Sequence, residues 1–332
     1  MVQKAKVYIT ECTNPYTNIA TEEYLTDNIQ NGEIVMFLWR NRRTVVIGRN
    51  QNAFAEVNVE ALREDGGFLA RRLSGGGAVF HDLGNLNFTF CARTPIYDVR
   101  KQLNVIISAL NTLGINATLS GRNDICVNDK KISGNAVYSH GDRHCHHGTL
   151  LIDVSERDMA KYLQVSRKKL ESNGVASVRA RVCNMSDIAA GLSAGSIAKA
   201  LEKEFFKEYG GVHIILKKKD FEIEAIRARA EQLASYTWCF GKSLSFDCTF
   251  DERFDFGGLS LNLCVVKGLI TDARAFSDAL FPQFCERLAA SLVGVRFSRE
   301  DVKSAIGALA PNSAEDEKIK CAALLLADKN MT

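Results

Sequence analysis

The sequence predicts an α+β protein, with a larger domain built on a mixed β-sheet followed by a smaller α+β domain. Three observations support this prediction. Strand-like and helical segments alternate through the first two thirds of the chain. A charged run, LKKKD at 216–220, and the irregular segment WCFGKSLSF at 238–246 then interrupt the pattern. Beyond them, short strands joined by glycine turns precede two or three short helices. We therefore expect domains at residues 1–245 and 250–332.

The elements follow from local sequence patterns. The expected strands of the larger domain are Val7–Thr10, Val35–Trp39, Thr44–Ile47, Phe68–Arg71, Leu86–Cys91 and Thr149–Val154. Its expected helices are Asn18–Ile29, Asp98–Leu113, Ser196–Tyr209 and Phe221–Ser235. Capping patterns after Ser155 and Ser298 predict two more helix starts. Ser193 lies in GLSAG, but no buried strand precedes it, so it is expected to be a helix N-cap and not a nucleophile.

Composition narrows the class of protein. The net charge is only +3, which does not require a nucleic-acid partner. No apolar run approaches the length of a membrane-spanning helix, and the first residues contain no signal-peptide core. The ten cysteines form no C-x-x-C pair, which predicts reduced thiols. We therefore expect a cytoplasmic protein that binds neither nucleic acid nor membrane.

The segment RRLSGGGAVFHDLGNLNFTF at 71–90 is the most informative part of the chain. Its three consecutive glycines can adopt positive φ and turn backbone N–H groups toward an anion, while Arg71 and Arg72 would supply charge. A tight turn between strands is the alternative, but it leaves the basic pair unexplained. Neither a P-loop nor a dinucleotide-binding pattern fits, because Phe80 stands where a third glycine is needed.

A second polar cluster follows at 121–153. Lys131 precedes the small-residue turn Ile132-Ser133-Gly134, where a lysine can act as a point charge on a carboxylate and a phosphate together. Asn123 and Asp124 offer groups for a hydroxyl or for Mg²⁺. An ordinary solvated lysine is the alternative at this position.

The run His144-Cys145-His146-His147 contains zinc-binding residue types. On an extended strand, however, alternate residues face opposite sides, so the four cannot converge, and no distant C-x-x-C or H-x-x-x-H partner exists. We expect no metal there, and expect His147 to border a ligand pocket. The basic segment 174–182 predicts either a loop that closes over a reactive intermediate or a plain surface loop.

Several segments, in order and spacing, resemble lipoate-protein ligase A: NIATEEYL, FLWRNRRTVVIGRNQN, ARRLSGGGAVFHDLGNLNFTF, GRNDI, KKISGNA, HHGTLLID, NGVASVRARVCNM, YTWCFG and RFDFGGLSL. The match spans nearly the whole chain. It implies a biotin/lipoate ligase-type catalytic domain, which binds lipoate and ATP in residues 1–245, and the accessory C-terminal domain of full-length ligases. The implied reaction activates lipoate with ATP and Mg²⁺ to lipoyl-AMP, then transfers the lipoyl group to a lysine of an acceptor. The implied acceptors are lipoyl domains of 2-oxoacid dehydrogenase E2 subunits and the glycine cleavage H protein.

The resemblance also assigns site residues. Lys131 and Arg72 are implied to be catalytic, with Lys131 contacting both the activated carbonyl and the α-phosphate. The implied lipoate-binding residues are Ile19, Glu22, Trp39, Ser74, Gly75, Gly76, Gly77, Val79, His81 and His147. The implied ATP- and adenylate-binding residues are Arg72, Gly77, Asn85, Asn123, Asp124, Lys131, Val178, Arg179, Arg181 and Val182, with Asp124 as the candidate Mg²⁺ ligand.

Two departures from the family pattern and three competing functions accompany this resemblance. Leu73 stands where a small or polar residue is common, and Cys239 where asparagine often separates the flanking aromatics. An octanoyltransferase would need Cys145 or Cys183 as nucleophile. The second competing function is a transferase that uses preformed lipoyl-AMP, and the third is a non-catalytic lipoate-binding protein. The preferred acceptor, the choice between lipoate and octanoate, the oligomeric state and domain rotation stay open at this stage.

Overall fold

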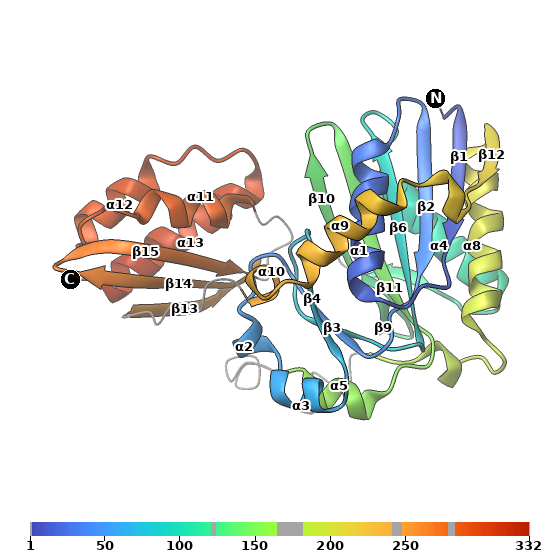
Figure 1. Cartoon of the computed structure of the whole chain (residues 1–332), viewed down its shortest axis with the longest axis horizontal. Helices are drawn as coiled ribbons and strands as arrows, with labels where there is room; N and C mark the ends of the chain where they lie inside the picture. The colour runs from blue at the N-terminus through green and yellow to red at the C-terminus, as the bar shows by residue number, and fades with distance from the viewer. Residues whose placement is uncertain (1, 121–123, 165–181, 241–247, 278–282, 332) are drawn as a thin grey trace. The chain divides into compact units, whose positions relative to one another are not determined.

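A computed structural model describes residues 2–120, 124–164, 182–240, 248–277 and 283–331 (Figure 1). The chain forms two compact units, and each is described by itself. Unit 1 comprises residues 1–46, 57–70 and 79–239, and unit 2 comprises residues 47–56, 71–78 and 240–332. The predicted α+β class is confirmed.

Unit 1 is built on a six-stranded mixed sheet in the order β10-β11-β6-β2-β1-β12. Its strands are β1 (Lys4–Ile9), β2 (Glu33–Trp39), β6 (Asn85–Arg93), β10 (Asn135–His140), β11 (Arg143–Leu151) and β12 (Val212–Ile215). β1 pairs in parallel with β2 and β12, whereas β2–β6, β6–β11 and β11–β10 are antiparallel.

Helices cover both faces of this sheet (Figure 1). One face packs against α4 (Val99–Thr112) and α8 (Ala194–Tyr209) through a large apolar core. The other packs against α1 (Pro15–Asn28), on which α9 (Ile223–Ala234) lies in turn. These starts follow helix-capping chemistry: Asn14 caps the first backbone N–H groups of α1 and proline occupies its N1 position. Ser193 caps α8, as predicted.

Smaller elements complete unit 1. Two three-stranded sheets, ordered β4-β3-β5 and β7-β8-β9, are formed by segments that lie between strands of the main sheet in the sequence. Their strands are β3 (Thr44–Ile47), β4 (Phe68–Arg71), β5 (Val79–His81), β7 (Thr118–Ser120), β8 (Asp124–Val127) and β9 (Lys130–Ser133). Among the described residues, the short helices are α2 (Ala53–Glu56), which belongs to unit 2, and α3 (Val59–Glu64), α5 (Glu156–Tyr162), η1 (Met185–Asp187), η2 (Lys218–Asp220) and α10 (Tyr236–Phe240).

Unit 2 contains a three-stranded antiparallel sheet and three helices around one apolar core. The strands are β13 (Cys248–Phe254), β14 (Gly257–Val266) and β15 (Leu269–Ser277), and the helices are α11 (Gln283–Leu292), α12 (Arg299–Gly307) and α13 (Ala314–Asn330). Segment 47–56 attaches here: the Asn50 carbonyl accepts a 2.9 Å bond from Ser277 N, and Arg49 pairs with Glu286 at 2.8 Å.

The predicted elements are present, with shifted ends. The strand expected at 149–154 overlaps the end of β11, which runs from Arg143 to Leu151. Its first half, RHCHH, is rich in polar residues and does not have the pattern of a buried strand in the sequence. The short strands β5, β7 to β10 and β12 were not predicted. Each of the ten cysteines, all within the described ranges, is a free thiol. In the described ranges, every helix is too short or too polar to cross a bilayer.

Candidate functional site

Polar side chains occupy every second position of two buried neighbouring strands. Along β6 these are Asn85, Asn87, Thr89 and Cys91, and along β11 they are Cys145, His147 and Thr149. The register pairs Cys91 with Cys145, Thr89 with His147 and Asn87 with Thr149. Because side chains alternate across a sheet, all seven lie on the face that α1 covers. We call this set the polar row.

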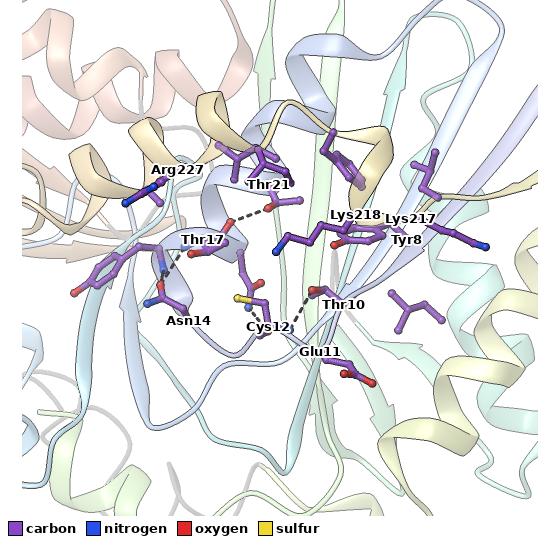
Figure 2. Close-up of a pocket in the computed structure, with 18 of the residues that line it drawn as sticks. Tyr8, Thr10, Glu11, Cys12, Asn14, Thr17, Thr21, Lys217, Lys218 and Arg227 are labelled. Atoms are coloured by element: carbon purple, nitrogen blue, oxygen red, sulfur yellow. Dashed lines mark hydrogen bonds between the residues drawn. The ribbon is translucent and has the colours of Figure 1, made fainter.

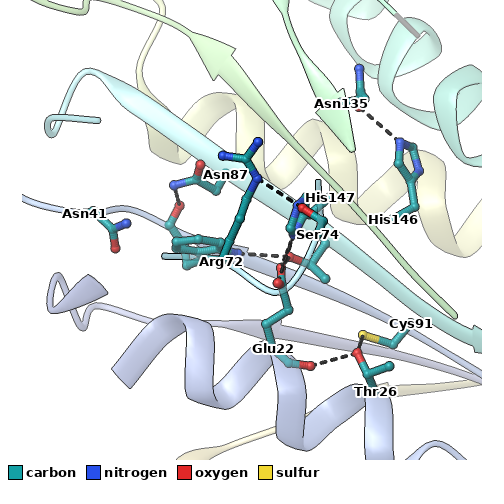
Figure 3. Close-up of polar contacts among 12 residues, drawn as sticks. Glu22, Thr26, Asn41, Arg72, Ser74, Asn87, Cys91, Asn135, His146 and His147 are labelled. Carbon is teal, nitrogen blue, oxygen red and sulfur yellow. Dashed lines mark hydrogen bonds and ion pairs between the residues drawn. The ribbon is translucent and has the colours of Figure 1, made fainter. Parts of the chain in front are cut away.

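Glu22 on α1 forms the centre of the polar row's hydrogen bonds (Figure 3). Its side chain is buried, and it accepts bonds from His147 Nδ1 at 2.8 and 2.9 Å and from Thr89 Oγ1 at 2.6 Å. Thr89 Oγ1 in turn accepts a 3.0 Å bond from Trp39 Nε1. A buried carboxylate with this many donors is held in one position before any ligand arrives.

His81 lies beside this network. Its ring meets that of Trp39 edge to face with centroids 6.2 Å apart, and its Nδ1 accepts a 3.2 Å bond from Asn41 Nδ2. Asn18, buried on α1, donates to Asn41 Oδ1 at 3.0 Å. Ile19 and Trp39 belong to the same apolar cluster, against which Val79 packs. Unit 1 therefore brings together six of the predicted lipoate-binding residues: Ile19, Glu22, Trp39, Val79, His81 and His147.

Lys131 lies at the Thr149 end of the polar row. Its Nζ pairs with Asp124 at 2.8 Å, and both side chains are more than one third exposed. A Cβ at Gly134 would stand 3.1 Å from Lys131 Nζ, so glycine leaves room for the ammonium group. Gly134 O accepts a 3.1 Å bond from Thr149 N. Thr149 is two residues from His147, about 7 Å along a strand.

Of the remaining residues predicted to bind ATP and adenylate, some lie within the described ranges and some lie outside them. Val182 forms a bridge with Lys131, and the Lys131 carbonyl accepts a 3.1 Å bond from Cys183 N. Asn85 is buried and donates to Asn87 Oδ1, while its own Oδ1 has no hydrogen-bond partner among the described residues. The predicted residues Asn123, Val178, Arg179 and Arg181 lie outside the described ranges.

Residues 71–78 contain the three consecutive glycines. We call this segment the glycine loop, and it belongs to unit 2. Buried Arg72 donates from Nε to Ser74 Oγ at 3.0 Å, and from Nη2 to the carbonyls of Gly75 and Gly77 at 2.7 and 2.8 Å. Gly76 has φ of 89°, which favours glycine, whereas a Cβ at Gly77 would face open space. Open backbone at Gly77 leaves room for a ligand to approach the loop.

Arg71 was expected to supply positive charge to an anionic ligand, but its guanidinium group bonds to backbone carbonyls. Its Nη1 donates to the carbonyls of Gly48, Arg49 and Gln51 at 3.1, 2.9 and 2.7 Å. A guanidinium carries several donors in one plane, and here they satisfy buried backbone acceptors. Arg71 therefore stabilises the segment 48–51, and Arg72 is the arginine that contacts the glycines.

Burial makes both candidate cysteine nucleophiles less reactive. Desolvation raises the pKa of the Cys145 thiol well above its usual value, with Cys91 and Glu22 adding to the effect. Desolvation also raises the pKa of Cys183. The thiolate is the nucleophilic form, so neither residue has the lowered pKa that a catalytic cysteine requires.

A separate cavity of about 760 Å³ lies between α1 and α9 in unit 1 (Figure 2). Tyr8, Thr17, Lys218 and Arg227 are among the residues that line it. None of the predicted site residues lines this cavity. It is therefore distinct from the polar row.

Comparison with known proteins decides the family. The lipoyl protein ligase A/B catalytic domain matches residues 14–206, and the bacterial lipoate protein ligase C-terminus matches residues 243–322. The chain belongs to the lipoyl protein ligase A/B family. Both the predicted resemblance and the predicted biotin/lipoate ligase-type fold are thereby confirmed.

The chain also resembles solved structures of lipoate ligases. The crystal structure of P. falciparum LipL1 in complex with lipoate is 30% identical, with a TM-score of 0.83 over 97% of this chain and 99% of that one. A bi-partite lipoate protein ligase with its E2 lipoyl domain, from Thermoplasma acidophilum, is 25% identical, with a TM-score of 0.63 over 75% and 100%. Lipoate-protein ligase A bound with ATP is 25% identical, with a TM-score of 0.62 over 73% and 99%.

Sequence reasoning did not identify Thr89, Asn41 and Thr149, which hold the predicted residues in place. The signal for Thr89 is the alternation of polar and aromatic residues in NLNFTFC, which indicates a strand buried on both sides with one polar face. Asn41 gave no such signal, because it lies in a loop.

Proposed function

We propose that this protein is an ATP-dependent lipoate-protein ligase that forms lipoyl-AMP and then transfers the lipoyl group to a lysine of an acceptor lipoyl domain. The observation that carries the proposal is the position of the Lys131 ammonium group beside Gly134, at the Thr149 end of the buried polar row, in which His147 bonds to Glu22. A carboxylic acid whose apolar end lies near His147 would present its carboxyl group toward Lys131.

The positive charges of Lys131 and Arg72 support the proposed adenylation step. Attack of a carboxylate on the α-phosphate brings two anions together, and positive charge must offset their repulsion. Lys131 supplies a point charge, and Arg72 on the glycine loop is proposed to supply a second. Neither residue needs to gain or lose a proton, so the barrier is lowered mainly by electrostatic stabilisation.

Mg²⁺ fits this set of residues through Asp124. Mg²⁺ takes oxygen ligands and is usually bound by one or two carboxylates together with substrate phosphates. Asp124 is half-buried and supplies one such carboxylate, next to Lys131. When bound, Mg²⁺ would neutralise phosphate charge. Lys131 then remains to stabilise the activated carbonyl.

Lipoate and ATP are each bound in related structures, and a related ligase was solved with its E2 lipoyl domain. We therefore propose lipoate and ATP as substrates here, with lipoyl domains of E2 subunits and the glycine cleavage H protein as acceptors. An acyl-carrier transferase that uses a cysteine is disfavoured, because burial raises the pKa of Cys145 and Cys183.

One experiment tests the proposal. The protein is incubated with lipoate, ATP, Mg²⁺ and a panel of acceptor domains, and acceptor mass and pyrophosphate release are measured with each component omitted in turn. We expect a lipoyl mass increase that requires all four. Modification without ATP when a carrier-bound acyl group replaces free lipoate would favour carrier-dependent transfer, and pyrophosphate release with no acceptor modified would contradict the transfer step.

The C-terminal domain, from about Thr249, is proposed to matter more for forming lipoyl-AMP than for transferring it. In unit 2, the segments 47–56 and 71–78 group with residues 240–332, so deletion removes partners of the segment beside the glycine loop. A chain that ends at Ser245 should lose pyrophosphate release while still transferring supplied lipoyl-AMP. Full pyrophosphate release by the shortened chain would refute this assignment.

A further inference from the structure

Three side chains of types that can bind metals lie close together at the end of the polar row away from Lys131. Glu22, Cys145 and His147 each present one ligand atom, and these atoms all lie within 4.8 Å of one another. The three residues are buried, with relative exposures of 1%, 0% and 8%. We propose that they form a binding site for a thiophilic divalent cation, with Zn²⁺ as the best match.

The ligand types select the metal. Thiolate, imidazole and carboxylate are the three protein ligands that Zn²⁺ takes, and sites with three protein ligands leave a fourth position for water or another molecule. Mg²⁺ and Ca²⁺ prefer oxygen ligands, so Cys145 discriminates against the ion proposed for Asp124. The two sites should therefore bind different metals.

Neighbouring groups hold the ligands in place. Thr89 Oγ1 donates to Glu22 at 2.6 Å and itself accepts from Trp39 Nε1. Cys145 is paired across the sheet with Cys91, whose Sγ lies 3.3 Å from Thr26 Oγ1. Outer partners of this kind fix ligand orientation in metal sites.

Binding requires one proton to leave. The Cys145 thiol releases its proton to solvent and coordinates as the thiolate. Coordination replaces the hydrogen bonds between His147 and Glu22, and the neutral imidazole keeps its single proton on the nitrogen that does not bind the metal. No oxidation or reduction takes place.

The proposed site uses two residues of the run His144 to His147, for which the sequence alone predicts no metal. The other two residues of the run do face the other side: His146 bonds to Gln102 and Asn135, and His144 to Thr94 and Ser139. Cys145 and His147 share a face, as alternation requires. Their third partner, Glu22, is 125 residues from His147 in the chain, and only folding brings it there.

Metal binding should also affect the proposed reaction. Because Glu22 and His147 are proposed to contact the lipoyl group, a cation between them would exclude lipoate. This consequence rests on the proposed function, whereas metal binding itself does not. Zn²⁺ should therefore raise the apparent KM for lipoate.

The test uses Co²⁺ as a spectroscopic probe on the full-length protein, freed of metal by chelation and kept reduced with a phosphine. We expect one equivalent of Co²⁺ to give a sulfur-to-cobalt charge-transfer band that Zn²⁺ abolishes. Cys145→Ala should remove the band, and Glu22→Gln should weaken Co²⁺ binding at least about tenfold, since a neutral amide replaces a charged ligand. Cys285→Ala is the matched control, because it removes another buried thiol, in unit 2, and should keep the band.

Thermal unfolding without metal checks that each variant folds. Absence of the band in the wild type, or an unchanged band in Cys145→Ala, would overturn the proposal, because another thiol would then be the ligand. In the second arm, Zn²⁺ should raise the KM for lipoate in the wild type and leave Cys145→Ala unaffected. If Co²⁺ binds through all three residues but Zn²⁺ leaves lipoate binding unchanged, the metal site stands and the proposed acyl pocket is wrong.

Discussion

His146 and His147 are neighbours in the chain, yet they lie on opposite faces of the six-stranded sheet. His147 faces α1 and donates to the Glu22 carboxylate. His146 faces α4, bonds to Gln102 and Asn135, and stacks on Phe90 with ring centroids 6.0 Å apart. Desolvation lowers the pKa of His146 to about 3, so it is neutral at ordinary pH.

The two faces of the sheet therefore differ in their expected roles, with the α4 face contributing to stability and the α1 face to the proposed chemistry. The α4 side of the sheet is an apolar core in which His146 is one satisfied polar group. The α1 side carries a charged carboxylate and a row of polar side chains that leads to Lys131. Changes to Lys131 should therefore alter catalysis at nearly constant stability, whereas changes to His146 should alter stability.

Lys131→Ala should give the largest effect. The Lys131 ammonium group is proposed to stabilise negative charge that develops in both transition states. Its removal should lower the rates of pyrophosphate release and of transfer from supplied lipoyl-AMP by about 10²–10³-fold. The free energy of unfolding should hardly change, because Lys131 is more than one third exposed. Lys131→Arg should recover little, since its planar head is larger.

The matched control is Lys130→Ala, the neighbouring exposed lysine of β9. The role assigned to Lys131 is electrostatic, so mass spectrometry should detect no lipoyl-Lys131 adduct. Wild-type rates in both half-reactions for Lys131→Ala would remove this residue from the mechanism.

Arg72→Ala should have the next largest effect. Charge-assisted hydrogen bonds of an arginine are worth about 1.5–3 kcal/mol each, so removing one should slow activation by roughly 10- to 150-fold. Part of the decrease would come from the loop, because Arg72 also holds the Gly75 and Gly77 carbonyls. Kinetics at varied lipoate and ATP separate these contributions. If neither dependence changes, the glycine loop is structural.

Local sequence patterns gave the predictions for His147 and Lys131. The position of His147 before Gly148-Thr149 predicted that it borders a pocket, and the turn after Lys131 predicted a positioned charge; both stay predictions. The roles of Glu22 and Trp39 came from resemblance alone, because an acidic residue on a helix is usually solvated. The assignment of the glycine loop to unit 2 was not predictable, since the partners of segment 47–56, such as Ser277, lie more than 200 residues away in the chain.

His146→Gln tests the α4 side through pH. Above pH 6.5 the histidine is neutral in both the folded and unfolded states, so it makes no pH-dependent contribution. As the pH falls from 6.5 toward 3, the unfolded chain takes up a proton that the folded protein does not, and stability is lost at about 1.4 kcal/mol per pH unit. Urea unfolding at pH 7, 6 and 5 should therefore show a shallower slope for His146→Gln than for the wild type. His213→Gln, at an exposed histidine, is the control, and equal slopes for wild type and His146→Gln would contradict the assigned burial effect.

Thr89→Val should give the smallest effect, and it tests whether the α1 side is purely functional. Valine keeps the shape of threonine but removes the hydroxyl that donates to Glu22 and accepts from Trp39. A buried group left without its partner costs about 1–3 kcal/mol, so the free energy of unfolding should fall by that amount. Because Glu22 keeps its bonds from His147, the KM for lipoate should rise only a few-fold and the rate of transfer from lipoyl-AMP should stay near that of the wild type. Thr118→Val, at an exposed position of β7, should change neither quantity. Loss of transfer in Thr89→Val at unchanged stability would show that the Glu22 network acts in the chemistry itself, and would contradict the stabilising role assigned to the Thr89 hydroxyl.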